Sequence, residues 1–204
     1  MQRGIALLSG GFDSPVAIHL MQERLEIVAA HFHQQELTGL QEVEKVRALV
    51  RALGLKKAYL IPFTFVLKAI VEKCTHKDYF ILQKIAMFQA AGMLAEKEGA
   101  HFLITGENLA QVSSQTLSNL TTITKHVSQE ILRPLLTYDK EEIIRVAKKI
   151  GTYETSKGPE ICSLLGPKHP ATKSDYAKIK MELEKLELQS LLQESIAKAE
   201  IMSL

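Results

Sequence analysis

The hexapeptide Ser9-Gly10-Gly11-Phe12-Asp13-Ser14 brings together residue types that can bind phosphate. Two adjacent glycines let the backbone turn with its N–H groups converging, the serines add hydroxyl donors, and a helix beginning here adds the positive end of its dipole. The carboxylate of Asp13 would repel phosphate unless it caps the helix or holds Mg²⁺ against the phosphate oxygens. The Walker pattern and the dinucleotide-binding glycine pattern are both absent. An anion site and a plain strand-to-helix turn capped by Asp13 therefore both stay open at this point.

Cys162 is the second candidate for chemistry. It lies in a stretch rich in glycine and proline, which predicts an accessible loop. Lys157, Lys168 and His169 are near it in sequence, and positive charge favours the thiolate, the nucleophilic form of cysteine. The alternative is an ordinary loop cysteine. Cys74 is predicted to be structural, and two cysteines so far apart form no metal-ligand cluster and favour a reduced setting.

Apolar runs that alternate with helical patterns must position these residues. Strands are predicted at residues 4–8, 27–32, 58–61 and 101–105, and helices at residues 13–23, 41–53 and 79–98. This alternation predicts an α/β fold, a doubly wound three-layer sandwich with a mainly parallel sheet. Ligands of such folds bind beyond the carboxyl ends of the strands, where the hexapeptide, His31 and Gly106 would lie.

The pattern is weaker beyond residue 118. Residues 132–136 are predicted to form an edge strand because Pro134 cannot donate to a central ladder. Asp139 is placed to cap a helix that runs to Ile150, with Glu142 at the capping-box spacing, and a loop is expected at residues 152–173. Residues 174–202 are predicted to be helical. Their apolar face packs either on the same chain, the commoner outcome, or on a second copy, and it contains Ile179, Leu183, Leu186, Leu191 and Ile196.

Composition restricts the class of protein. The chain has 204 residues, of which 46% are hydrophobic and 24% charged, and this is typical of one globular domain rather than a disordered chain. No apolar run is long enough for a membrane span, and the N-terminal residues do not resemble a signal peptide, so a cytoplasmic protein is expected. The formal net charge is only +2, whereas proteins that bind nucleic acid unaided are usually clearly basic.

The hexapeptide resembles the PP-loop, Ser-Gly-Gly-x-Asp-Ser, of the ATP pyrophosphatases. Residues 7–17, Leu-Leu-Ser-Gly-Gly-Phe-Asp-Ser-Pro-Val-Ala, are similar in particular to the tRNA 4-thiouridine synthetase family, also called ThiI, which serves thiamine thiazole synthesis too. Residues 105–116, residues 132–144 and residues 160–173 resemble three further motifs of that family in the same order. The resemblance implies an adenine nucleotide alpha-hydrolase-like fold, with a PP-loop domain at residues 1–173 and a C-terminal helical extension at residues 174–204 packed on the same domain.

The resemblance also implies roles for individual residues. Catalytic roles fall on Asp13, Lys140 and Cys162, although Lys140 is equally well explained as a surface lysine. Lys84 stands where relatives commonly have an Arg-Arg pair, and the pair here is Gln83-Lys84, so the contact to phosphate lacks arginine's bidentate fork. His31 taken alone would be a strand-end histidine, and Lys84 taken alone a solvated lysine. The residues implied to bind the nucleotide are Leu7, Leu8, Ser9, Gly10, Gly11, Asp13, Ser14, His31, Phe32, Lys84, Gly106 and Gln115.

The implied activity is ATP-dependent sulfur transfer to tRNA, with Mg²⁺ as the second cofactor. The enzyme would adenylate a tRNA uridine, release pyrophosphate, and then accept persulfide sulfur from a cysteine desulfurase or a rhodanese-like protein. Relatives carry a THUMP region before the PP-loop, which here begins at residue 9, so a separate THUMP-type subunit is expected to present the tRNA. Two alternatives are an adenylating enzyme acting on a sulfur-carrier protein or a small molecule, and an ATP-binding module without turnover. A homodimer is also left open.

Overall fold

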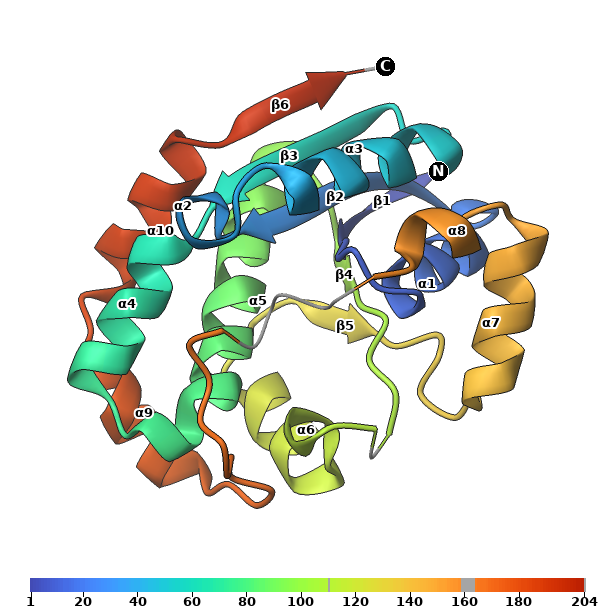
Figure 1. Cartoon of the computed structure of the whole chain (residues 1–204). Coiled ribbons are helices and arrows are strands. Elements are labelled where there is room, and N and C mark those ends of the chain that lie inside the picture. The colour runs from blue at the N-terminus through green and yellow to red at the C-terminus, as the bar shows by residue number, and fades with distance from the viewer. Residues whose placement is uncertain (110, 159–163, 204) are drawn as a thin grey trace.

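The computed structural model describes residues 1–109, 111–158 and 164–203, and six strands of this chain form one sheet (Figure 1). The order across the sheet is β5-β4-β1-β2-β3-β6, and every neighbouring pair is parallel except β3 and β6. The predicted, mainly parallel sheet is confirmed. The strands are β1 (Gln2–Leu7), β2 (Leu25–His33), β3 (Lys57–Pro62), β4 (Phe102–Ile104), β5 (Glu130–Leu132) and β6 (Glu200–Ser203).

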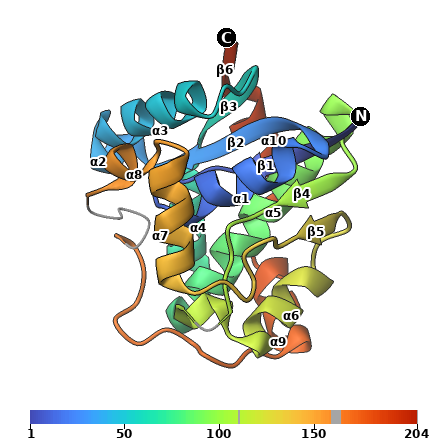
Figure 2. The same cartoon turned by 90° about the vertical axis from the view of Figure 1, so that its right-hand side faces the viewer.

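Helices cover both faces of the sheet, as the prediction of a three-layer sandwich requires. Adjacent strand residues point to opposite faces, so Ile5 belongs to the core beneath α5 and α10, whereas Ala6 belongs to the core beneath α1 and α3. Figure 2 shows α1 and α7 on the near side of the molecule and α10 on the far side. The helices are α1 (Asp13–Gln22), α2 (Gln35–Thr38), α3 (Gln41–Ala52), α4 (Thr64–Lys73), α5 (Tyr79–Glu98), α6 (Leu117–Lys125), α7 (Lys140–Lys149), α8 (Tyr153–Ser156), α9 (Tyr176–Glu184) and α10 (Leu188–Ala197), with 3₁₀ turns η1 (His76–Asp78) and η2 (Ser113–Gln115).

The last thirty residues depart from the predicted single helix. Two helices, α9 and α10, are followed by β6, which pairs antiparallel with β3 and buries Met202. A strand of four residues has too little periodicity to be told from the end of a helix by its pattern alone. The apolar residues expected on the helical face do pack within the chain. Ile179 and Leu186 are buried in the core that also contains residues of α4 and α5, and Leu183, Leu191 and Ile196 pack against it.

Smaller corrections concern β5 and the loop after α7. The edge strand ends at Leu132, two residues before Pro134, so the proline follows the strand rather than lying within it. The predicted loop at residues 152–173 begins with the short helix α8. The capping box of α7 is confirmed, because Glu142 N donates to Asp139 at 2.7 Å and Asp139 N donates to Glu142 at 2.8 Å. Within the described residues, no helix combines the length and apolar character needed to cross a membrane.

Candidate functional site

A cavity of about 720 Å³ lies at the carboxyl ends of β1, β2 and β4. The strand order reverses between β1 and β4, and this is the switch point at which doubly wound sheets bind ligands. The cavity wall is formed by the loop after β1, the ends of β2 and β4, the start of α3, the first half of α5, and residues from η2 and from the segment after α8. Every residue predicted to bind a nucleotide lines it: Leu7, Leu8, Ser9, Gly10, Gly11, Asp13, Ser14, His31, Phe32, Lys84, Gly106 and Gln115.

The loop at residues 9–14 is held in shape by its two serines. The Ser14 hydroxyl accepts from the backbone N–H of Ser9 at 2.8 Å and lies 3.0 Å from the Ser9 hydroxyl, which in turn accepts from Gly11 N at 3.3 Å. Asp13 is the first residue of α1 and Phe12 occupies the N-cap position without a side-chain bond, so the interpretation of Asp13 as the cap is wrong. Asp13 is instead one of the residues that line the cavity.

Gly106 is required by the packing of two segments. A Cβ at this position would lie 2.6 Å from both Asp13 C and Ser14 N, closer than side-chain carbons approach backbone. We predicted that Gly106 lets the backbone approach a nucleotide. The close approach found in the structure is to the loop itself, and it brings the end of β4 against the first turn of α1.

His31 presents a hydrogen-bond acceptor at the cavity wall. Its Nδ1 lies 2.9 Å from the carbonyl oxygen of Leu8, which can only accept, so Nδ1 carries the proton. Burial lowers the pKa of His31 to about 4, and the ring is therefore neutral at neutral pH with a lone pair on Nε2. Among the described residues, this buried Nε2 has no protein partner. Phe32, beside it, packs edge-on against the ring of Phe63.

Two further buried acceptors line the same cavity. Glu42 Oε2 and Gln115 Oε1 have no hydrogen-bond partner within the part of the chain that the structure describes. Burial raises the pKa of the Glu42 carboxyl, and the charge of Lys45 opposes this. Buried acceptors without partners are costly, so these atoms and His31 Nε2 favour a ligand that carries N–H or O–H donors.

Lys84 takes part in an ion-pair network that the sequence did not reveal. Its Nζ lies 2.6 Å from Glu107 Oε1, and the other oxygen of Glu107 accepts from Arg133 Nε at 2.8 Å. Glu107 is only 1% exposed. Burial would raise the pKa of the Glu107 carboxyl, but the charges and hydrogen bonds of Lys84 and Arg133 outweigh it and hold that pKa below its usual value. Lys84 is therefore a positioned charge at the cavity and not a solvated lysine.

Lys45 and Lys157 add positive charge to the cavity wall. Lys45 extends from α3, where no motif marks it, and its Nζ donates to the carbonyl oxygen of Ser156 at 3.0 Å. Lys157 follows α8 and forms an ion pair with Glu154 at 2.9 Å. Neither residue was predicted to line the nucleotide cavity, because each reaches it through tertiary packing; Lys157 was named only as a basic neighbour of Cys162.

The remaining predicted residues lie elsewhere or outside the description. Lys140 is the exposed first residue of α7 and is not among the residues that line the cavity. Cys162 falls outside the described residues, although Gly158 before it and Pro170 after it line the cavity. Cys74 donates to the carbonyl oxygen of Glu182, and burial raises its pKa to about 11, in keeping with a structural role. No group of three or more potential metal-ligating side chains occurs in residues 1–109, 111–158 and 164–203.

Comparison with known proteins places the chain among relatives of about twice its length. A family model described as "Thiamine biosynthesis protein (ThiI)" matches residues 1–188. A probable tRNA sulfurtransferase of Moorella thermoacetica is 41% identical, and the match covers 98% of this chain and 53% of that protein. The corresponding protein of Coxiella burnetii is 39% identical with the same coverage. The chain thus spans about half the length of the curated relatives it matches.

Solved structures show the same fold. A crystal structure of a 4-thiouridine synthetase–RNA complex with bound ATP matches with a TM-score of 0.94 at 33% identity, over 100% of this chain and 55% of that one. An NH3-dependent NAD synthetase from Campylobacter jejuni matches with a TM-score of 0.58 at 17% identity, over 97% of this chain and 85% of that one. The second likeness extends the fold to a more distant protein.

Proposed function

This chain belongs to the ThiI family, and from that premise we propose that it is the ATP-dependent module of a tRNA sulfurtransferase. In this proposal O4 of a tRNA uridine attacks the α-phosphate of ATP and pyrophosphate leaves. Persulfide sulfur then attacks the activated C4, and the C4–O bond breaks with release of AMP. The observation that carries the proposal is that one cavity wall combines two kinds of chemical group. The glycine loop, the start of α1 and the lysines supply groups that attract anions, and His31, Glu42 and Gln115 supply acceptors without a protein partner among the described residues.

The two kinds of group fit the two ends of ATP. The loop at residues 9–14 and the N-terminus of α1 suit the phosphates, because converging N–H groups and the helix dipole attract anions. The acceptors on His31, Glu42 and Gln115 suit the amino group of adenine and the hydroxyls of ribose, which are donors. Phe32 adds an apolar side chain to the same cavity wall. An adenine nucleotide would thus satisfy buried atoms that have no protein partner among the described residues.

Asp13 suits the role of ligand for a magnesium ion, since it lines the cavity next to the glycine loop and carboxylate oxygens are preferred Mg²⁺ ligands. When bound, Mg²⁺ would neutralise charge on the departing pyrophosphate. The chain itself positions the reacting groups. The serine hydrogen bonds hold the shape of the glycine loop, Gly106 allows β4 to pack against that loop, and the ion pair with Glu107 holds Lys84 at the cavity wall. The near-attack geometry of uridine O4 and the α-phosphorus would depend on this rigidity.

The persulfide step is assigned to Cys162, with Lys140 as a further catalytic group. Support for Cys162 comes from its flanks, because Gly158 and Pro170 both line the cavity. A cysteine desulfurase or rhodanese-like protein would supply the sulfur, and a THUMP-type subunit or domain would present the tRNA. An exposed Lys140 at the start of α7 suits contact with a large substrate that approaches from outside.

Pyrophosphate release tests the first step. We expect release from ATP that depends on added tRNA together with a THUMP-type subunit, and we expect Asp13→Ala to abolish it. Pyrophosphate release that depends instead on a sulfur-carrier protein would show that the substrate is the carboxylate of that protein and not tRNA. ATP binding with no release under either condition would identify a non-catalytic nucleotide-binding module and contradict the proposal.

The cysteine assignment has its own test. Cys162→Ser should leave pyrophosphate release largely intact and stop formation of thiolated tRNA, because a serine hydroxyl cannot carry the transferred sulfur. Cys74→Ser serves as the matched control, since the Cys74 thiol is half-buried and bonded to the Glu182 carbonyl. Unchanged thiolation in the Cys162→Ser protein would refute the assignment without affecting the adenylation step.

A further inference from the structure

Lys45 lies directly over the glycine loop although it is far from it in sequence. It extends from the middle of α3, and its side chain lines the cavity. A Cβ built on Gly10 would lie 3.1 Å from Lys45 Cδ and 3.6 Å from Nζ. The lysine side chain therefore occupies the space that a side chain at position 10 would fill. The ammonium group therefore stands beside the N–H groups that would hold phosphate.

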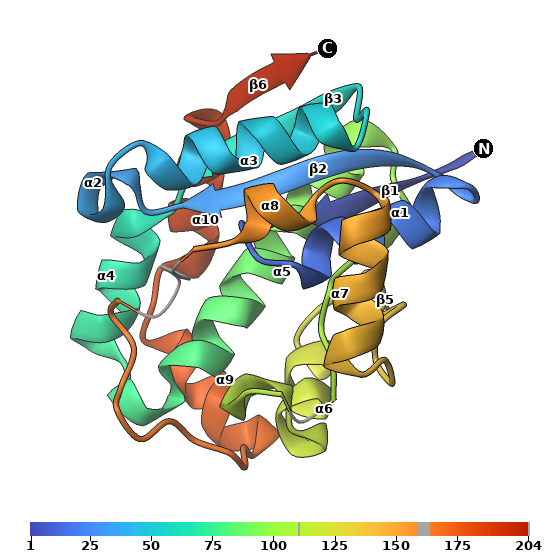
Figure 3. The same cartoon turned by 45° about the vertical axis from the view of Figure 1, so that its right-hand side comes forward.

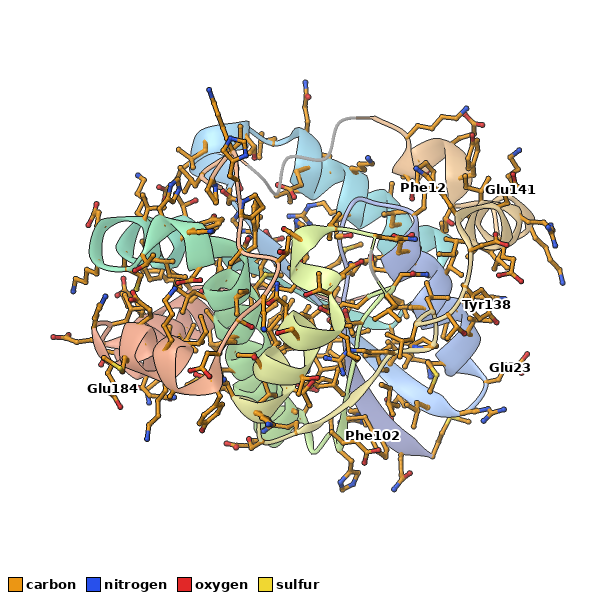
Figure 4. The ribbon with its side chains drawn as sticks, turned by 90° about the horizontal axis from the view of Figure 1, so that it is seen from below. Phe12, Glu23, Phe102, Tyr138, Glu141 and Glu184 are labelled. Atoms are coloured by element: carbon orange, nitrogen blue, oxygen red, sulfur yellow. The ribbon has the colours of Figure 1, made fainter. Side chains whose placement is uncertain are left out.

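The same ammonium group also contacts the segment after α7. Lys45 Nζ donates to the Ser156 carbonyl oxygen at 3.0 Å, and the Ser156 hydroxyl donates to the Gly11 carbonyl oxygen at 3.3 Å. Phe12, labelled in Figure 4, stacks on Tyr153 of α8 with ring centroids 5.3 Å apart. Figure 3 shows α8 lying on the side of the sheet that carries α1 and α3. Lys45, α8 and the loop thus form one connected assembly.

We propose that Lys45 is a phosphate-binding residue of the ATP site and that it also positions α8 over the loop. The inference rests on the proposed function insofar as ATP is the ligand. An ammonium group carries three donors, so the bond to Ser156 is compatible with a contact to a phosphate oxygen. A neutral donor would be enough to hold the Ser156 carbonyl, whereas lysine also brings a full positive charge to Gly10, where the anion would sit.

The positive charge of Lys45 is carried by a well-packed helix, α3. The face of α3 that carries Lys45 is anchored by the buried Val46 and Leu49, and Glu42 lies one turn earlier on the same side of the helix at the cavity wall. Helix placement limits how far the ammonium can move when phosphate binds or leaves. Lys45 therefore differs from Lys157, which is half-exposed and paired with Glu154 outside the loop.

Calorimetric titration of the purified chain with ATP and, separately, with adenosine tests the phosphate role. Lys45→Gln keeps a long side chain with a donor for Ser156 but removes the charge. We expect ATP affinity to fall roughly 10- to 100-fold, as for loss of a charge-assisted hydrogen bond, while adenosine affinity stays within about twofold of wild type. Lys45→Arg, which keeps the charge, should retain most of the ATP affinity, and Arg51→Ala on the exposed side of the same helix should change neither.

The outcomes separate this inference from the proposed function. If the wild-type protein binds ATP and the Lys45→Gln protein binds it with the same affinity, the phosphate role of Lys45 is overturned and the proposed function is not. Equal losses of ATP and adenosine affinity also overturn it, since they mean that Lys45 only supports the fold of the site. Wild-type protein that binds no ATP overturns both. Inorganic pyrophosphate as a competitor gives a second readout, and it should displace ATP less well from Lys45→Gln than from wild type.

Discussion

His31 is a buried group whose proton is linked to folding. Its pKa is about 4 in the folded protein against an ordinary 6.5, so the unfolded chain binds the proton first as the pH falls. The free energy of unfolding should therefore decrease between about pH 6.5 and pH 4, by up to about 3 kcal/mol, and this contribution should level off below pH 4. Urea unfolding between pH 4 and pH 8 measures it.

His31→Asn isolates this effect, because asparagine can still donate to the Leu8 carbonyl but does not titrate. The wild-type protein should lose stability relative to His31→Asn as the pH falls through that range. His101→Asn, at an exposed position, should run parallel to wild type. If the stability of wild type and of His31→Asn changes with pH in parallel, the His31 side chain is not desolvated, and this would contradict the structure.

Glu107 is the carboxylate on which two cations depend. Glu107→Gln leaves Lys84 and Arg133 without their shared counter-charge in a largely buried setting, and we expect the free energy of unfolding to fall by about 3 kcal/mol. Chemical denaturation at pH 7 gives the value. Glu141→Gln, at an exposed position on α7, should cost less than about 0.5 kcal/mol, and an equally small loss at Glu107 would contradict the network.

Individual site residues were predictable where one local motif contains them. The hexapeptide, His31 and Gly106 each follow a predicted strand, so the topology alone brings them to one edge of the sheet. Lys45 could not be found in this way. Its partners Gly10 and Ser156 lie in distant segments, and a lysine on an amphipathic helix has the same pattern whether it faces solvent or a loop.

At the level of elements, Gly106 joins the end of β4 to the start of α1. Gly106→Ala would place a methyl group 2.6 Å from the Asp13 and Ser14 backbone, so the loop must shift. We expect ATP affinity to fall at least roughly tenfold, because displaced N–H groups no longer converge on the phosphates. Calorimetric titration measures this.

Gly151→Ala is the matched control for that change. Gly151 has a positive φ of 72° with open space around its Cβ, so the substitution costs about 1 kcal/mol of stability through backbone strain but leaves the loop in place. It should bind ATP like wild type. Full ATP affinity in the Gly106→Ala protein would mean that the loop tolerates the shift.

The pairing of β6 with β3 gives a second prediction about elements. Met202 is 8% exposed and packs into the core, whereas Ile201 on the other face is 48% exposed. Met202→Ala should therefore lower the free energy of unfolding by about 2 to 3 kcal/mol and Ile201→Ala by less than about 1 kcal/mol. Denaturant unfolding of the two variants checks this, and equal losses would exclude the antiparallel pairing.

Helices with strong periodicity were predictable almost to the residue, and short elements were not. The bounds of α5 match the prediction, since twenty residues of apolar pattern end at Gly99 with a left-handed φ. β6 and α8 are four residues each and are stabilised by tertiary contacts, the first by β3 and the second by the glycine loop. Their local sequences do not contain those contacts.

For the molecule as a whole, the small net charge limits how strongly it can hold a polyanion. A formal charge of +2 provides little long-range attraction for RNA. We expect this chain alone to bind tRNA with a dissociation constant of about 1 μM or weaker at physiological salt, and to bind at least about tenfold more tightly when a THUMP-type subunit is added. Fluorescence anisotropy with labelled tRNA measures both. Nanomolar binding by the chain alone would show that its basic residues are gathered into one surface.

The position of β6 at the edge of the sheet has a consequence for biosynthesis. Lys57 of β3 pairs with Ser203 of β6. Since β3 precedes β6 in the chain, the outer edge of β3 is covered only after residues 200–203 have left the ribosome. Until then the nascent sheet exposes a row of unpaired N–H and C=O groups, which is where strands from other chains can add. The parallel core can form during translation, but protection of this edge from intermolecular pairing depends on residues 200–203, which emerge long after β3.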